Sequence, residues 1–320
     1  MDIIRHRRWF FLLSALLVLP SLGALLVQPS LRPGIDFTGG TALTIEFETA
    51  IDATEVRSRV EGIGHEDAIV QALDDRSFFI RVGELVPEQT DADGNLIDAG
   101  GRAELKAALA SIAPVDIVAV DSVSALVGSE NVTNAVIAVV VASIAILLYV
   151  TWAFRRVPSP LRYGTAAIVA LVHDVVVVLG TFSYLGKFAD VEVNAMFITG
   201  VLTVIGYSVN DTIVVFDRLR ENVARYQGGS LPDLANISIR ETIGRSLNTS
   251  LTLLIVVGAL LLFGGPTIQP LLLVLLVGVV VGTYSSIFVA TLMLVAWETG
   301  ELGRGLSRMN PFGGRKSRTA

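Results

Sequence analysis

Hydrophobic positions along the chain gather into six long stretches, separated by polar loops and by one long polar region at 28–131. The stretches cover 9–27, 132–154, 163–186, 195–216, 246–264 and 270–297. Each approaches or exceeds the ~20 apolar residues that cross the hydrocarbon of a bilayer. The pattern predicts a polytopic α-helical membrane protein with six transmembrane helices, the last five within 132–297.

The first stretch follows the basic segment Arg5–Arg8, as the core of a secretory signal would. Its apolar run, Trp9–Val27, is longer than the roughly 7–15 residues typical of a cleavable signal, and it ends in Gln28-Pro29. We therefore expect a retained transmembrane helix.

Basic residues lie in the loops on one side of this arrangement. They precede the first stretch, follow the second at Arg155 and Arg156, separate the fourth and fifth at 218–245, and occupy the tail from Arg304 onward, whereas 187–194 and 264–270 hold one Lys between them. Because Lys and Arg favour cytoplasmic loops, 1–8 and 298–320 are predicted to be cytoplasmic and 28–131 extracytoplasmic. The expected location is the cell inner (cytoplasmic) membrane, which the chain crosses several times.

The polar region predicts an extracytoplasmic α+β domain. Leu43, Ile45 and Phe47 alternate with polar residues in a strand at 41–48, and Asp52 with Glu55 resembles the capping box that opens a helix. Strands near 68–73 and 77–82, a helix at about 101–112 and a strand at 115–120 complete the order βαββαβ. This is the ferredoxin-like arrangement, with a core expected to contain Leu43, Ile45, Phe47, Val56, Val60, Leu105, Leu109 and Ile112.

Composition and motifs remove several classes of function. With 52% hydrophobic residues, 17% charged residues and no cysteine, the chain is no ordinary soluble domain and uses no disulfide. The segment Asp91–Asn95 lacks the third acid and the closing glutamate of a calcium loop, and it is interpreted as a turn. No Walker or Gly-x-Gly-x-x-Gly sequence occurs, so we expect no cofactor, no metal and no enzymatic activity, with energy supplied by a gradient or a partner.

Asp211 is the most informative single residue. It lies within the run 201–216 and is flanked on both sides by mostly apolar residues. A carboxylate inside a bilayer is costly unless it is paired, hydrated or protonated. Asp211 therefore marks an ion path or a proton relay, or else an acid permanently paired with Arg. Its small or hydrogen-bonding neighbours, which also let another helix approach closely, are Gly206, Ser208, Asn210 and Thr212.

Arg245 opens the fifth stretch and is the nearest candidate countercharge for Asp211. An arginine does not release its proton in practice, so it would hold or free the carboxylate without carrying protons. The alternative is an ordinary positive-inside anchor. A polar face continues into the stretch through Asn248, Thr249 and Ser250.

Two other motifs attract attention. His173 and Asp174 stand in the middle of the third stretch, where they form either a proton relay or a structural hydrogen bond between helices. Just after the first stretch, the segment Asp36-Phe37-Thr38-Gly39-Gly40 is interpreted as a tight turn that leads into the first strand. In the sixth stretch, Gly282–Ser286 is interpreted as a small, polar packing surface.

Together these motifs resemble the SecD/SecF family of protein-export membrane proteins, within the resistance-nodulation-division superfamily. The matching segments are Asp36–Thr41, His173-Asp174, Gly206–Asn222, Arg245–Ser250 and Gly282–Ala290, and they are spread over nearly the whole chain. The SecD branch usually has Asp-Ala-Asn where this chain has Asn210-Asp211-Thr212, and it carries a much larger outer region. Both differences favour the SecF branch.

The resemblance implies an accessory subunit of the Sec protein translocase. Such a subunit pairs with SecD, associates with the SecYEG translocon and with translocating preproteins, and has YajC and YidC as further candidate partners; no nucleic acid is expected. It uses the proton motive force to promote preprotein export. By analogy Asp211 is the proton-linked carboxylate and Arg245 its partner, with His173 and Asp174 as further proton-coupling residues.

Other classes of protein remain open at this stage. A passive scaffold that stabilises the translocon would have the same Asp211–Arg245 pair. A proton-coupled half of a small-molecule or lipid transporter would need a second large outer loop, and loop 187–194 is too short for one. An intramembrane hydrolase would need a nucleophile beside a base, for which His173 and distant serines are a weak case.

Overall fold

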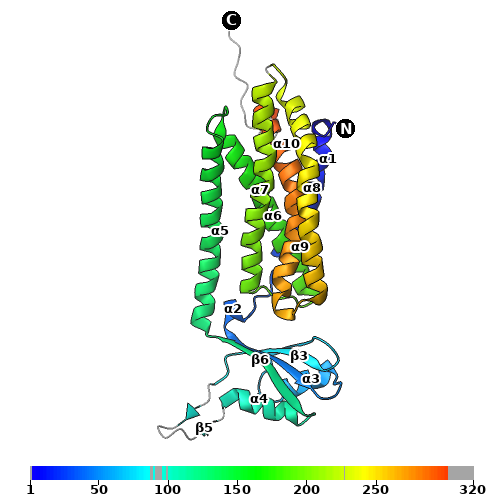
Figure 1. Ribbon diagram of the computed structural model, residues 1–320. Coiled ribbons are helices and arrows are strands. Elements are labelled where there is room, and N and C mark those ends of the chain that lie inside the picture. The colour runs from blue at the N-terminus through cyan, green and yellow to red at the C-terminus, as the bar shows by residue number, and fades with distance from the viewer. Residues whose placement is uncertain (1, 87–88, 91–95, 99, 227, 302–320) are drawn as a thin grey trace. The chain divides into compact units, whose positions relative to one another are not determined.

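The computed structural model describes residues 2–86, 89–90, 96–98, 100–226 and 228–301. The chain divides into two compact units, one formed by Met1–Arg32 with Ala138–Ala320 and the other by Pro33–Ile137. The first unit contains most of the long helices and the second contains the α+β domain (Figure 1). The boundary at Ile137 falls inside a long helix rather than in a loop.

A four-stranded antiparallel sheet forms the centre of the α+β domain. Its strands β1 (Gly40–Phe47), β2 (Ile69–Ala72), β3 (Ser77–Val82) and β6 (Val115–Val123) lie in the order β2-β3-β1-β6. Helix α3 (Ala53–Glu61) joins β1 to β2, α4 (Gly100–Ala110) precedes β6, and the short helix α2 (Ile35–Thr38) precedes β1. This topology confirms the predicted ferredoxin-like βαββαβ fold.

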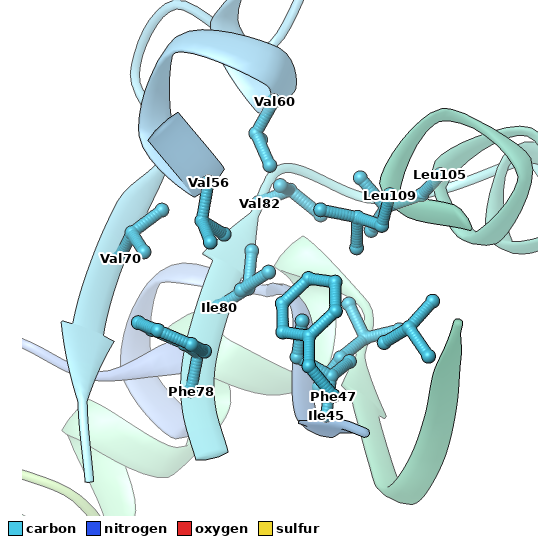
Figure 2. Close-up of a cluster of buried hydrophobic side chains, with 12 residues drawn as sticks. Ile45, Phe47, Val56, Val60, Val70, Phe78, Ile80, Val82, Leu105 and Leu109 are labelled. Atoms are coloured by element: carbon cyan, nitrogen blue, oxygen red, sulfur yellow. The ribbon is translucent and has the colours of Figure 1, made fainter. Parts of the chain in front are cut away.

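The core of this domain lies between one face of the sheet and the helices α3 and α4 (Figure 2). Its buried cluster contains every predicted core residue except Ile112, which is partly buried at the margin. Ile112 follows the end of α4 and so leaves the helix face that carries Leu105 and Leu109. Asp52 caps α3 as predicted, because its carboxylate accepts a 2.7 Å hydrogen bond from the Thr54 backbone N–H.

Between β3 and α4 the chain adds a small hairpin that no sequence pattern predicted. Its strands are β4 (Gln89–Thr90) and β5 (Leu96–Asp98), which pair antiparallel. The predicted turn at Asp91–Asn95 lies outside the described residues.

Six helical segments in the described chain are long and apolar enough to cross a membrane, as predicted. They are Ile4–Leu26, which contains α1 (Arg7–Leu26); α5 (Ala125–Ala153); α6 (Pro160–Phe188); α7 (Ala195–Arg225); α8 (Leu231–Phe263); and Gln269–Glu298, which contains α9 (Gln269–Tyr284), the π-helical η3 (Ser285–Ala290) and α10 (Thr291–Glu298). Helices α7 and α8 extend well beyond the apolar stretches that predicted them. Their polar extensions are tied together by a 2.7 Å hydrogen bond from Arg218 Nε to Glu241 Oε2.

Glycines bring α7 and α9 close enough for their polar residues to meet. A Cβ added to Gly278 of α9 would lie 2.2 Å from Val204 Cγ2 on α7. One helical turn further on, a Cβ on Gly282 would lie 3.1 Å from Ser208 Cβ and 3.6 Å from Asp174 Oδ2. Because a Cβ at Gly278 would overlap Val204, α7 and α9 pack closely there, and the next turn of α9 faces Ser208 and Asp174.

Candidate functional site

Asp174 lies at the centre of a buried hydroxyl cluster between α6, α7 and η3. Its Oδ2 accepts hydrogen bonds from Ser208 Oγ at 2.6 Å and from Ser285 Oγ at 2.7 Å. Its Oδ1 lies 3.1 Å from Nδ1 of His173. The side chain is 1% exposed, so protein hydroxyl groups take the place of water around the carboxyl group. In the described part of the chain, Nε2 of His173 is buried without a hydrogen-bond partner.

The π-helical segment η3 supplies two hydroxyls to this cluster. While Ser285 donates to Asp174, Ser286 Oγ donates to the Ser208 backbone oxygen at 2.8 Å and lies 3.0 Å from Thr212 Oγ1. A π-helical turn is rare and often occurs at functional sites. The segment Gly282–Ser286 therefore serves packing, as expected, and also supplies hydrogen-bond donors that were not predicted.

Asp211 lies on a neighbouring face of α7, directed toward α8. Its side chain is 4% exposed, and its carboxylate interacts with the Ser246 hydroxyl and with the charge of Arg245. Among the described residues, Asp211 Oδ2 and Ser246 Oγ are both buried atoms without a well-formed hydrogen bond. The burial of Asp211 is thus only partly compensated, in contrast to that of Asp174.

A groove of about 480 Å³ lies between α7 and α8. Arg245 lines the groove and is exposed. It acts on Asp211 through its charge, without a direct ion pair among the residues that the structure describes. Water in the groove therefore reaches Arg245, whereas Asp211 does not line it. Its other lining residues are Ile213, Val214, Asp217, Arg218, Glu221, Glu241 and Thr242.

Three charged residues of the groove, Arg218, Glu221 and Glu241, are paired with one another. Arg218 forms ion pairs with Glu221 and with Glu241. Asn222, which is fully buried, donates from Nδ2 to Ser238 Oγ and to Glu241 Oε2, both at 2.9 Å. These contacts join α7 to α8 along the groove.

The predicted polar neighbours of Asp211 and Arg245 separate into buried and exposed groups. Ser250 is buried, and its Oγ lies 3.0 Å from Tyr207 Oη and 2.5 Å from Thr283 Oγ1. The exposed group is Gly206, Asn210, Asn248 and Thr249. A Cβ on Gly206 would meet nothing within 4 Å, so the close helix approach expected there occurs within this chain at Gly278 instead, because Gly206 faces away from α9.

The paired-glycine motif forms the predicted tight turn. Gly39 and Gly40 have φ values of +74° and +123°, which lie in the region that favours glycine. A Cβ on Gly40 would come within 2.6 Å of the Val82 backbone oxygen. The motif residues Asp36 and Phe37 belong to α2, immediately before this turn.

Several residues of the two clusters were missed by the sequence patterns. Ser246 and Tyr207 were not singled out, and Thr283, Ser285 and Ser286 were predicted only as part of the packing surface Gly282–Ser286. A signal was present, because Ser246 and Ser250 are four residues apart and so share one face of α8. No group of three or more His, Cys, Asp or Glu residues in the described chain is placed to hold a metal ion.

Comparison with known proteins relates this chain to protein-export membrane proteins. A family model described as "Protein export membrane protein SecD/SecF, C-terminal" matches residues 104–300, and one described as "SecD/SecF GG Motif" matches 25–51. "Protein translocase subunit SecF" of Thermobaculum terrenum is 43% identical over 317 residues, which cover 97% of this chain and 98% of that protein. Its counterpart of the same name in Anaerolinea thermophila is 38% identical, with 94% and 95% covered.

A solved structure supports the same relationship. The crystal structure of SecDF from Thermus thermophilus, described as a translocon-associated membrane protein, has a TM-score of 0.79 and 34% sequence identity over 93% of this chain. The match covers 39% of the solved chain. The chain therefore spans about two fifths of the length of that protein.

Proposed function

The chain belongs to the SecD/SecF family of protein-export membrane proteins, and from this we propose that it works as an accessory subunit of the Sec protein translocase. It is a multi-pass membrane protein. In the proposed function it pairs with SecD at the SecYEG translocon and uses the proton motive force to promote export of preproteins. YajC and YidC are proposed as further partners from the family resemblance alone.

The Asp211 environment is the observation that carries the proposal. A carboxyl group that must gain and lose a proton needs surroundings that satisfy neither charge state completely. Asp211 is buried, its Oδ2 lacks a well-formed hydrogen bond, and Arg245 is near enough to act through its charge without forming a direct pair. A small movement of α8 against α7 would change both the Ser246 contact and the distance to the guanidinium.

Each neighbour has a distinct role in this scheme. Arg245 keeps its proton and controls the charge of Asp211 by approaching or withdrawing. The charged groove between α7 and α8 exposes Arg245 to water. The His173–Asp174 cluster is a second proton-coupling site, where hydroxyl groups from α7 and η3 hold the carboxyl group.

The exposed polar residues of α7 and α8 support pairing with SecD. Asn210 and Asn248 are exposed on helices that cross the membrane. Polar side chains that face lipid are costly, and a second membrane protein that offers hydrogen bonds or a carboxylate would remove that cost.

We propose that the protein lies in the inner membrane of the cell with both chain termini in the cytoplasm, on the basis of the basic loops. Single cysteines introduced into loop 187–194 and into the tail test this orientation by labelling from outside, because the chain has no cysteine of its own. Labelling of the tail from outside would show that the orientation is the reverse of the one proposed.

Export in sealed membrane vesicles tests the function. Preprotein translocation is started with ATP, the ATP is removed, and completion is followed with and without a proton gradient. Asp211→Asn keeps the shape of the side chain and should abolish the stimulation by the gradient while the complex with SecD still assembles. Asp217→Asn, on the same helix and ion-paired to Arg220, is the matched control and should export as wild type does. Gradient-stimulated export that survives in Asp211→Asn would favour a passive scaffold.

A further inference from the structure

The paired-glycine motif packs backbone to backbone on the first turns of α5. A Cβ on Gly39 would lie 2.7 Å from both the Cα and the N of Ala125. From the other side, a Cβ on Gly128 would lie 2.8 Å from Gly39 N and 3.0 Å from the carbonyl of Phe37. These distances are shorter than real Cβ contacts allow, so both glycines are required for the approach.

Further contacts close the junction around this packing. Strands β1 and β6 stay paired up to Gly40 and Val123, and one residue, Ser124, separates β6 from α5. The Ser124 backbone oxygen accepts from Gly128 N at 3.0 Å. Asn131 Nδ2, one turn along α5, donates to the Asp36 backbone oxygen at 2.9 Å. The junction between the sheet and α5 is therefore held at several points, and the unit boundary falls later, at Ile137.

Beyond these first turns, α5 has few contacts until its far end. Only 6% of its most apolar window is buried. At the far end, Phe154 is 2% exposed and stacks on Tyr163 of α6, with ring centroids 5.3 Å apart. Its ring also meets Phe216 edge to face at 6.0 Å. Phe216 belongs to α7 and follows Asp211 by little more than one helical turn, so the residue that follows α5 contacts the helix that carries the proposed proton site.

We propose that the paired-glycine motif is a clamp that joins the α+β domain and the first turns of α5 into one rigid piece, with α5 as the strut between that piece and α7. Gly39 and Gly128 are positioning residues in this device. This inference rests on the proposed function, because the strut would carry movement between the Asp211 region and the α+β domain. A flexible joint at Ser124 would let the domain move without the helix; the clamp prevents that.

Gly128→Ala tests the clamp with a minimal change. Alanine has a higher helix propensity than glycine. The substitution should therefore stabilise α5 itself and disrupt only the contact with Gly39 and Phe37. Gly258→Ala is the matched control, because Gly258 lies within α8 and a Cβ there would meet nothing within 4 Å. Asn131→Ala is a second test that removes the hydrogen bond to Asp36 without adding an atom to the junction.

Two measurements on the full chain in its complex decide the outcome. Spin labels on cysteines that replace the exposed Glu66 and Asn134 report the distance between the domain and α5, and vesicle export reports the coupling. We expect one narrow distance distribution in wild type and in Gly258→Ala, and a broad one in Gly128→Ala and Asn131→Ala. Gly128→Ala and Asn131→Ala should lose gradient-stimulated export but keep ATP-driven export. A general loss of folding would lower both kinds of export.

The clamp is overturned if the distribution stays narrow in both variants, or if it broadens while gradient-stimulated export is unchanged. Should Gly128→Ala fail to assemble, Asn131→Ala decides alone. Failure of the proposed function is a separate result: Asp211→Asn would then export as wild type does, while the distance distributions would still report whether the clamp exists.

Discussion

Removal of the Ser208 hydroxyl tests whether Asp174 is ionised in this structure. Ser208→Ala deletes one donor to Asp174 Oδ2, which keeps its second donor, Ser285. Ser183→Ala is a closely matched control on α6. The Ser183 hydroxyl is 1% exposed and donates to the Ala24 backbone oxygen at 2.9 Å, and that oxygen keeps a second donor, Lys187 Nζ.

The two substitutions differ mainly in the charge of the acceptor. A hydrogen bond to a charged group contributes about 1.5–3 kcal/mol, whereas one between neutral groups contributes about 0.5–1.5 kcal/mol. Ser208→Ala should therefore lower the free energy of unfolding by about 1 kcal/mol more than Ser183→Ala, if Asp174 carries its charge. In an Asp174→Asn background the Ser208 hydroxyl would meet a neutral amide, and the extra cost should disappear.

Equilibrium unfolding in mixed micelles measures both the cost of each substitution and the coupling between positions 174 and 208. The double-mutant cycle consists of wild type, Ser208→Ala, Asp174→Asn and the double variant. The expected result is a coupling energy between positions 174 and 208 of about 1 kcal/mol or more, within the range found for contacting residues. Equal costs for Ser208→Ala and Ser183→Ala, together with no coupling, would mean that Asp174 is neutral here and that its hydroxyl neighbours only fill space.

Three further outcomes follow from the structure. Leu109→Ala, at a core position that is 1% exposed, should lower the stability of the α+β domain by about 2–5 kcal/mol, measured by hydrogen exchange in the full chain; a cost below about 0.5 kcal/mol would place the residue outside the core. Hydrogen bonds from the Thr54 hydroxyl and backbone N–H hold the pKa of Asp52 below its usual value of 3.8, so its stabilising effect is complete above pH 3.8 and disappears as the pH falls through the lower folded pKa; Asp52→Asn should destabilise the domain at neutral pH and match wild type in strong acid, and an equal loss at every pH would exclude this linkage. Gly278→Ala should separate α7 from α9, because its Cβ would lie 2.2 Å from Val204, at a cost of about 1–3 kcal/mol in mixed-micelle unfolding; a cost near zero would mean that the two helices shift freely.

The α+β domain was predictable because each element is encoded locally. Alternation through Leu43, Ile45 and Phe47 selects a strand face, and Asp52 marks where α3 begins. The hairpin β4–β5 could not be predicted, since its short strands carry no apolar periodicity. The six membrane helices were predictable from apolar length, but the ends of α7 and α8 were not, because their polar extensions are held by contacts between two helices.

The candidate site divides in the same way. Asp211, Asp174 and Arg245 were found because charge inside an apolar run is visible in the sequence. Ser246 and Ser285 were not, since a serine in a membrane helix is common and becomes informative only when a neighbouring helix brings an acid to it. The contacts of Gly39 with α5 were equally hidden, because they depend on the path by which β6 enters the helix.

In the proposed function, Asp211 changes its charge state within the pH range in which the protein works. Infrared difference spectroscopy on the complex in lipid, recorded as the pH is changed, detects the carbonyl stretch of a protonated carboxylic acid directly. We expect a band that appears as the pH is lowered, is absent in Asp211→Asn and is retained in the control Asp217→Asn. The midpoint pH of this band should shift more in Arg245→Met than in Arg245→Lys. A spectrum in Asp211→Asn that is the same as in wild type would contradict the account, because the proton would then be carried elsewhere.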